Sequence, residues 1–260
     1  MSILVATDLS TRSVAALRFA EELAQRLDTS LAIVHVAPDT RPDIAEDARN
    51  ALSMFLREYM GKPEGHPTQL VVGDTVCRAL ADAANGHELI VCGATGSSYL
   101  DDIFLGSTAS RLIRESPIPV CVVPDGHVAM FECIAVPLGF DEASRSGLDL
   151  AAQIARRADS SIALFSAVSE YGDTSAAESN ARALLEGIAQ DADLDDLNVT
   201  YDVWVGEPAE GIRQAVERMN ADIVVMGTHG RGEQSLYFLG SVAERIVRQP
   251  PCAVITTRPT

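Results

Sequence analysis

The chain has 260 residues, enough for one large domain or two ordinary ones, and its 47% hydrophobic content is that of a globular protein. Aromatic residues make up only 5%, and a composition rich in Ala, Val, Ile and Leu suits helices packed on a parallel sheet. The formal net charge of −17 argues against nucleic acid and anionic membranes as partners, because both present negative charge and attract a basic surface.

Short apolar runs alternate with amphipathic patterns along the first half, which predicts strands alternating with helices. This alternation predicts a parallel sheet with right-handed crossovers. The predicted strands are Ile3–Ala6, Leu31–Val36, Gln69–Val72, Leu89–Cys92 and Val120–Val123. The predicted helices are Ser13–Leu27, a segment with Ile44, Ala48, Leu52, Phe55 and Tyr59 on one face, Thr75–Ala84, and one that includes Ser107–Arg114.

The same pattern then starts again. Ile134–Val136 repeats Ile3–Val5, and Val203-Trp204-Val205-Gly206 repeats Leu70-Val71-Val72-Gly73 with nearly the same offset. Such self-similarity over half the chain indicates a tandem duplication of one domain. We therefore predict an α/β protein with two tandem doubly wound domains, each a five-stranded parallel sheet with about four helices. The predicted domains are residues 1–126 and 131–260.

A spaced glycine signature occurs once in each half, directly after a strand-like run. The second half has Gly227-Thr228-His229-Gly230 and, nine residues later, Gly240-Ser241. The first half has Gly93-Ala94-Thr95-Gly96 and, nine residues later, Gly106-Ser107. A strand that breaks into glycines and continues as a helix leaves backbone N–H groups free at the helix start, where the helix dipole also favours an anion. The pattern predicts a phosphate site that depends on backbone donors, despite the acidic chain.

Three other residues of the first half are predicted to line the same crevice. Ligands of open α/β sheets bind beyond the carboxyl ends of the strands, where the strand order reverses. Asp8 follows the first strand and can accept hydrogen bonds from adenine or ribose, while Val36 and Cys92 can form apolar walls. Neither half contains GxxxxGK[ST] or GxGxxG, so neither is a P-loop or a dinucleotide fingerprint. The corresponding residues of the second half are Gly139, Ala167 and Met226.

The chain resembles the universal stress protein family in its tandem two-domain form. The run from Met226-Gly227-Thr228-His229-Gly230-Arg231 to Leu239-Gly240-Ser241-Val242-Ala243-Glu244-Arg245 is similar to the family's G-2x-G-9x-G-(S/T) ATP-binding loop. Val136-Pro137-Leu138-Gly139-Phe140-Asp141-Glu142-Ala143-Ser144 resembles the family's first strand and turn. The resemblance implies a Rossmann-like fold of the adenine nucleotide α-hydrolase type, binding of ATP or AMP, and pairing of the two domains through their fifth strands.

The predicted ligand is therefore ATP, or AMP or ADP, with Mg²⁺ as the ion that can accompany it. The halves differ, since the second has Gly139 where the first has Asp8, and the first has Ser97 where the second has Arg231. The first half also places Asp101 and Asp102 in its loop. The predicted nucleotide contacts are Asp8, Val36, Cys92, Gly93, Gly96, Gly106, Ser107 and Thr108 in the first half. In the second half they are Pro137, Met226, Gly227, His229, Gly230, Arg231, Gly240, Ser241 and Val242.

Several of these residues have a purely structural alternative. Asp8 can be a cap of the first helix, and Ser107 and Ser241 can be plain N-caps. His229 has no Ser, Cys or carboxylate placed to form a triad with it, so it is expected beside the phosphates. His35 lies in an apolar strand and is expected to be a core histidine with a hydrogen-bond partner.

The cysteines and the chain start bear on the compartment. The five cysteines lack paired spacing, and neither CxxC nor HExxH occurs, so the sequence indicates small buried hydrophobes rather than redox or zinc sites. Met1–Ala6 is too short for a signal peptide, and no stretch approaches the ~18 apolar residues of a membrane helix. We predict a cytoplasmic protein.

The function predicted from these features is that of a non-enzymatic nucleotide-binding protein with a regulatory or stress-response role. One alternative is a slow ATPase or metal-dependent hydrolase, whose phosphate release would be abolished by Gly230→Val or Gly96→Val. Another is a nucleotide-free scaffold. Dimerisation of the whole chain stays open at this point, because pairing of the two halves could use up the sheet edge internally.

Overall fold

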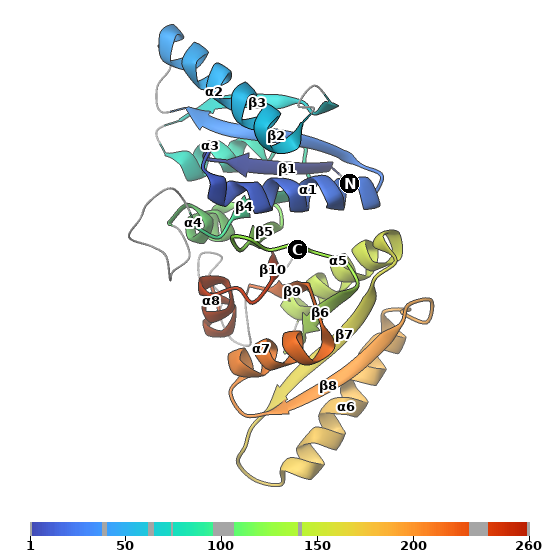
Figure 1. Cartoon of the computed structure of the whole chain (residues 1–260). Helices are drawn as coiled ribbons and strands as arrows, with labels where there is room; N and C mark the ends of the chain where they lie inside the picture. Colours follow the sequence, from blue (N-terminus) through green and yellow to red (C-terminus); the bar gives the residue numbers. More distant parts are fainter. Residues whose placement is uncertain are drawn as a thin grey trace. The chain divides into compact units, whose positions relative to one another are not determined.

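The computed structural model of the protein describes residues 2–37, 41–61, 65–73, 75–95, 107–139, 142–228 and 239–258, with the side chains of residues 42, 107, 142 and 143 excepted. It consists of two compact units, and the main division falls between Val128 and Ala129. The exact domain limits of 1–126 and 131–260 stay a prediction. Each unit is described by itself below (Figure 1).

Strands alternate with helices in the first half, as the apolar pattern predicts. In chain order the elements are β1 (Ser2–Thr7), the 3₁₀ turn η1 (Thr11–Ser13), α1 (Val14–Arg26), β2 (Ser30–Ala37), α2 (Pro42–Met60), β3 (Thr68–Val72), α3 (Val76–Ala83), β4 (Leu89–Gly93), α4 (Ser107–Glu115) and β5 (Val120–Val123).

The second half repeats this order. Its elements are β6 (Cys133–Pro137), α5 (Glu142–Ala158), β7 (Ser161–Val168), α6 (Thr174–Asp191), β8 (Val199–Val205), α7 (Pro208–Met219), β9 (Ile223–Gly227), α8 (Ser241–Arg248) and β10 (Ala253–Thr257).

Each half contains five strands in the doubly wound order. The first half has the order β3-β2-β1-β4-β5 and the second β10-β9-β6-β7-β8. The described pairs within each half are parallel, for example Ile3 of β1 with Leu31 of β2 and with Leu89 of β4. The prediction of two tandem α/β domains with five-stranded parallel sheets is therefore confirmed. The first and fourth strands of each half are neighbours, so the strand order reverses between them and a crevice opens there.

The sheets are buried because helices cover both faces. Strand centres such as Val5, Ile33 and Val224 are completely buried, as expected for parallel strands with continuous apolar sequences. Right-handed crossovers place α5 and α6 on one face of the second sheet and α7 and α8 on the other (Figure 1). Ligands of open α/β sheets bind beyond the carboxyl ends of the strands.

Helix starts follow ordinary capping chemistry. Thr75 accepts a hydrogen bond from the backbone N–H of Arg78 at the start of α3, and Asp173 accepts one from Ala176 at the start of α6. None of the helices within the described residues has the length and hydropathy to cross a membrane.

Candidate functional site

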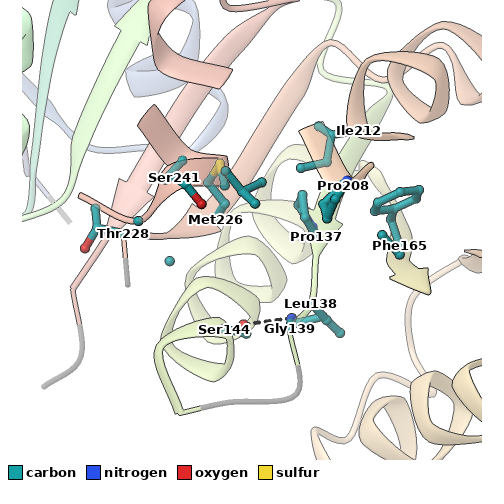
Figure 2. A pocket seen from close by; sticks show the side chains of 15 residues that line it. Pro137, Leu138, Gly139, Ser144, Phe165, Pro208, Ile212, Met226, Thr228 and Ser241 are labelled. Carbon is teal, nitrogen blue, oxygen red and sulfur yellow. Dashed lines mark hydrogen bonds between the residues drawn. The ribbon is translucent and has the colours of Figure 1, made fainter. Parts of the chain in front are cut away.

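The second half has a cavity at the carboxyl ends of β6, β7 and β9, which we name the strand-end cavity. Its volume is about 220 Å³. Figure 2 shows Met226, Thr228 and Ser241 on one side of it and Pro137, Pro208, Ile212 and Phe165 on the other. The described residues that line it are Pro137, Leu138, Gly139, Ser144, Phe165, Ala167, Pro208, Ile212, Met226, Gly227, Thr228, Gly240, Ser241, Val242 and Ala243.

The two ends of the glycine loop are joined by hydrogen bonds. The backbone N–H of Gly240 donates to the carbonyl oxygen of Thr228 at 2.7 Å. Thr228 itself donates to the carbonyl oxygen of Thr257 from its backbone N–H at 2.9 Å and from its hydroxyl at 3.1 Å. Residues 229–238, which include the predicted contacts His229, Gly230 and Arg231, lie outside the described part of the chain. The anchored ends nevertheless position the start of α8 beside β9.

The position of Ser241 at the start of α8 differs from the N-cap position that was the structural alternative. The backbone N–H of Glu244 donates to the carbonyl oxygen of Gly240 at 2.8 Å, so Gly240 is the N-cap and Ser241 is the first helical residue. The expectation of Ser241 as an N-cap is therefore wrong. The backbone N–H groups of the first helical residues have no partner within a helix, and here these residues line the cavity. The arrangement can donate hydrogen bonds to an anion.

The opposite wall of the cavity is apolar and closely packed. Phe165 is 2% exposed, and α7 approaches it at Gly211. A Cβ atom at Gly211 would lie 2.8 Å from Cζ of Phe165 and 2.5 Å from Cγ of Trp204, so only glycine allows this approach. Gly211 thus packs against both Trp204 and Phe165, and Phe165 lines the cavity.

The cavity is electrically neutral in its described lining. None of the lining residues that the structure describes carries a carboxylate, a guanidinium, an ammonium group or an imidazole. Across all residues that the structure describes, no group of three or more His, Cys, Asp or Glu side chains could hold a metal ion. Polarity in this lining therefore comes from hydroxyl and backbone groups.

The floor of the cavity is a short hydrogen-bonded turn between β6 and α5. The backbone N–H of Gly139 donates to the hydroxyl of Ser144 at 3.0 Å (Figure 2). The hydroxyl of Ser166, in β7, donates to the carbonyl oxygen of Leu138 at 3.2 Å. These two bonds fix the backbone at the carboxyl end of β6 through Ser144 and Ser166.

In the first half, Asp8 at the end of β1 is exposed and bonded locally. Its Oδ1 accepts hydrogen bonds from the backbone N–H of Ser10 at 3.0 Å and from the Ser10 hydroxyl at 2.6 Å. Neither donor belongs to a helix, so the alternative role of Asp8 as a helix cap is wrong.

Other predicted residues of the first half occupy the expected strand ends. Val36 is half-buried in β2, and Cys92 is 6% exposed in β4. A Cβ atom at Gly93 would lie 3.5 Å from the carbonyl oxygen of Arg12, so the end of β4 packs closely on the turn before α1. Thr108 is half-buried in the first turn of α4. Gly96 and Gly106 lie outside the described residues, as does the side chain of Ser107.

The buried thiols fit a structural role. All five cysteines are free and buried. Burial raises the pKa of Cys92 to about 12 and, with the neighbouring Glu115 carboxylate, the pKa of Cys77 to about 11. A thiol with such a pKa stays protonated near neutral pH and is a poor nucleophile.

The strand-end cavity unites six of the predicted residues with several that sequence reasoning missed. The predicted residues are Pro137, Met226, Gly227, Gly240, Ser241 and Val242. The missed ones are Leu138, Ser144, Phe165, Pro208, Ile212, Thr228 and Ala243. A local signal existed for Pro208, since proline favours the first helical position and the Glu207 carboxylate accepts from the N–H groups of Ala209 and Glu210. Phe165 had no such signal, because an apolar strand residue can face either helix layer.

Comparison with known proteins identifies the family. The model of the "Universal stress protein family" matches residues 1–124 and again residues 130–258. A universal stress protein of Mycolicibacterium smegmatis is 31% identical over 99% of this chain and 97% of its own length. The crystal structure of a universal stress protein from Archaeoglobus fulgidus shares the fold, with a TM-score of 0.76 and 20% identity over 100% of this chain and 98% of that one. A universal stress protein solved in complex with cAMP covers 51% of this chain with a TM-score of 0.42 and 18% identity.

Proposed function

Because this chain belongs to the universal stress protein family in its tandem form, we propose that its second half binds an adenine nucleotide and that the protein acts as a nucleotide-dependent regulator. One observation carries the proposal. An apolar cavity meets the amino-terminal end of α8 at the carboxyl ends of β6 and β9, which is where open α/β sheets bind ligands.

The two sides of the strand-end cavity suit the two ends of a nucleotide. Phe165, Ala167 and Ile212 supply apolar surface for a base, and the backbone N–H groups at Ser241 and Val242 supply donors for phosphate. The volume of about 220 Å³ is below the roughly 300–1,000 Å³ of complete small-molecule sites. We therefore expect base and sugar inside the cavity and the phosphates outside it, over the first turn of α8.

The absence of charged side chains from the described lining affects where Mg²⁺ can bind. Mg²⁺ prefers oxygen ligands and usually keeps several waters, and the described lining offers hydroxyls but no carboxylate. We expect Mg²⁺ to enter on the phosphates of ATP. Hydrolysis requires a base that positions water at the phosphates, so phosphate release by the purified protein separates the ATPase alternative from binding and regulation.

The decisive experiment removes backbone donors while keeping the helix. Ser241→Pro deletes one N–H and one hydroxyl, yet proline is favoured at the first helical position, so α8 should persist. Two lost hydrogen bonds to a charged group, at roughly 1.5–3 kcal/mol for each bond, predict an affinity for ATP that is about 100- to 10,000-fold weaker by titration calorimetry. Ser241→Ala, which loses only the hydroxyl, should fall between wild type and Ser241→Pro.

Ser107→Pro is the matched control, because Ser107 is the first residue of α4 in the other half. It should leave the affinity of the second half unchanged. Trp204 is the only tryptophan, and it packs on Gly211, which also packs on the cavity residue Phe165. Its fluorescence therefore gives a second readout of binding. No heat, no change in Trp204 fluorescence and no nucleotide in the mass spectrum of the purified protein would together refute nucleotide binding and favour the scaffold.

Three further expectations belong to the same proposal. Pairing of the two halves through their fifth strands, dimerisation of the chain and a cytoplasmic location all stay predictions. Occupancy of the first half, through Asp8 and its glycine loop, is a separate prediction that the stoichiometry of the titration tests.

A further inference from the structure

We propose that the nucleotide site of the second half extends across the end of β6 into a second cavity, and that the extended site takes an adenine dinucleotide. This inference rests on the proposed function, because the first nucleotide unit would occupy the strand-end cavity. The second cavity, which we name the α5–α6 cavity, has a volume of about 310 Å³.

The two cavities meet at one place in the fold. Leu138 and Ser144 line both of them. The strand-end cavity is otherwise bounded by α7 and α8, and the α5–α6 cavity by α5 and α6, which cover the opposite face of the sheet. A ligand that uses both must therefore cross the carboxyl end of β6, beside the point where the strand order reverses, which is where dinucleotides cross other doubly wound sheets.

The hollow beside α6 is not required by packing. A Cβ atom at Gly187 would meet nothing within 4 Å, so this mid-helix glycine is not needed for a close approach. Glycine in a helix interior costs about 1 kcal/mol relative to alanine. Leu184 lies one turn before Gly187 on the same stripe and is 53% exposed. The exposed Leu184 and the open space beside Gly187 therefore leave room for a ligand on this side of α6.

The chemistry of the α5–α6 cavity suits a second nucleotide unit. Leu184 and Ile188 form an apolar floor for a ring, and Arg145 and Asp191 lie at its rim. Within the described part of the chain, neither of these two charged side chains has a salt bridge or a side-chain hydrogen bond. A guanidinium can bind a phosphate through two N–H groups, and a carboxylate can accept from ribose hydroxyls. Arg145 would thus take the phosphate that follows the one at α8.

The test compares AMP with NAD⁺ on the full-length protein by titration calorimetry, because the two share one nucleotide unit. Wild type should bind NAD⁺ at least about tenfold more tightly than AMP. Gly187→Phe fills the α5–α6 cavity and should reduce the affinity for NAD⁺ to that for AMP, while AMP binding stays within about twofold of wild type. Gly187→Ala is the matched control: it should raise the melting temperature and leave the preference for NAD⁺ in place.

Arg145→Gln provides a second variant that removes charge without adding volume, in case Gly187→Phe fails to fold. It should weaken NAD⁺ binding and leave AMP binding unchanged. If AMP binds but NAD⁺ binds no more tightly, or if the variants weaken both ligands equally, the dinucleotide inference is overturned and the proposed function stands. If neither AMP nor ATP binds wild type, both are overturned.

Discussion

The two halves of the chain share one framework and differ at the end of their first strand. In both halves, a polar side chain of the second strand donates a hydrogen bond to a backbone carbonyl oxygen at the carboxyl end of the first strand. His35 Nδ1 lies 2.8 Å from the carbonyl oxygen of Thr7, and the Ser166 hydroxyl lies 3.2 Å from that of Leu138. Because a carbonyl oxygen only accepts, Nδ1 of His35 carries the hydrogen.

Beyond that shared bond, the first half is polar. The hydroxyls of Thr7 and Ser13 lie 2.8 Å apart, and the Thr7 hydroxyl oxygen also accepts the backbone N–H of Leu9 at 3.0 Å. The second half has apolar Leu138 at the position of Thr7 and Gly139 at the position of Asp8, and both line the strand-end cavity. Duplication therefore preserved the backbone and its anchoring bonds, while the side chains at the ends of the first strands diverged.

The largest effect is expected where the halves are alike. Leu17 of α1 and Leu148 of α5 occupy matching positions and are 0% and 2% exposed. Leu17→Ala and Leu148→Ala should each lower the free energy of unfolding by about 2–5 kcal/mol, since each leaves a cavity in a close-packed core. Chemical denaturation of each variant gives the comparison. A loss below about 1 kcal/mol in only one half would show that the two cores are not equivalent.

The next effect separates the halves. Ala167 and Val36 are the matching residues of β7 and β2, and Ala167 lines the strand-end cavity. Ala167→Trp fills the space expected for the base and should weaken ATP binding at least about 100-fold, or ~2.7 kcal/mol. Val36→Trp should leave that affinity unchanged. The reverse result, measured by calorimetry, would move the principal site to the first half.

The smallest effect concerns the buried thiols at alkaline pH. Burial raises the pKa of Cys92 in the first half and of Cys252 in the second from 9.0 to about 12. The unfolded chain loses these protons above pH 9, while the folded chain keeps them. The contribution of each buried, protonated thiol to the free energy of unfolding is therefore fully present below pH 9 and is lost as the pH rises towards 12. At pH 10 the expected loss is about 1.4 kcal/mol for each thiol.

Cys92→Ala and Cys252→Ala should each flatten the fall in melting temperature between pH 8 and pH 10, relative to wild type. The comparison uses the slope and not the absolute value, because alanine also leaves a small cavity at every pH. An unchanged slope in both variants would mean that these thiols ionise in the folded protein as readily as in the unfolded one.

Local patterns were sufficient for much of the fold. The apolar run at Leu31–Val36 predicts the core of β2, which the structure extends by one residue at each end to Ser30–Ala37. The stripe from Ile44 to Tyr59 predicts α2, and the glycine signatures predict the ends of β4 and β9 and the starts of α4 and α8. Such features depend on residues close in sequence, whose periodicity is set by backbone geometry.

By itself, then, the sequence determined the duplication, the parallel α/β class and the residues at which backbone donors meet a strand end. Only the tertiary structure decided that Ser241 is the first residue of α8 rather than its cap, that Asp8 is held by Ser10, and that Phe165 and Ile212 complete a cavity. The reason is physical. A wall of a cavity is formed by side chains from separate elements, and which of them meet depends on how helices pack across the sheet, which periodicity along one element does not specify.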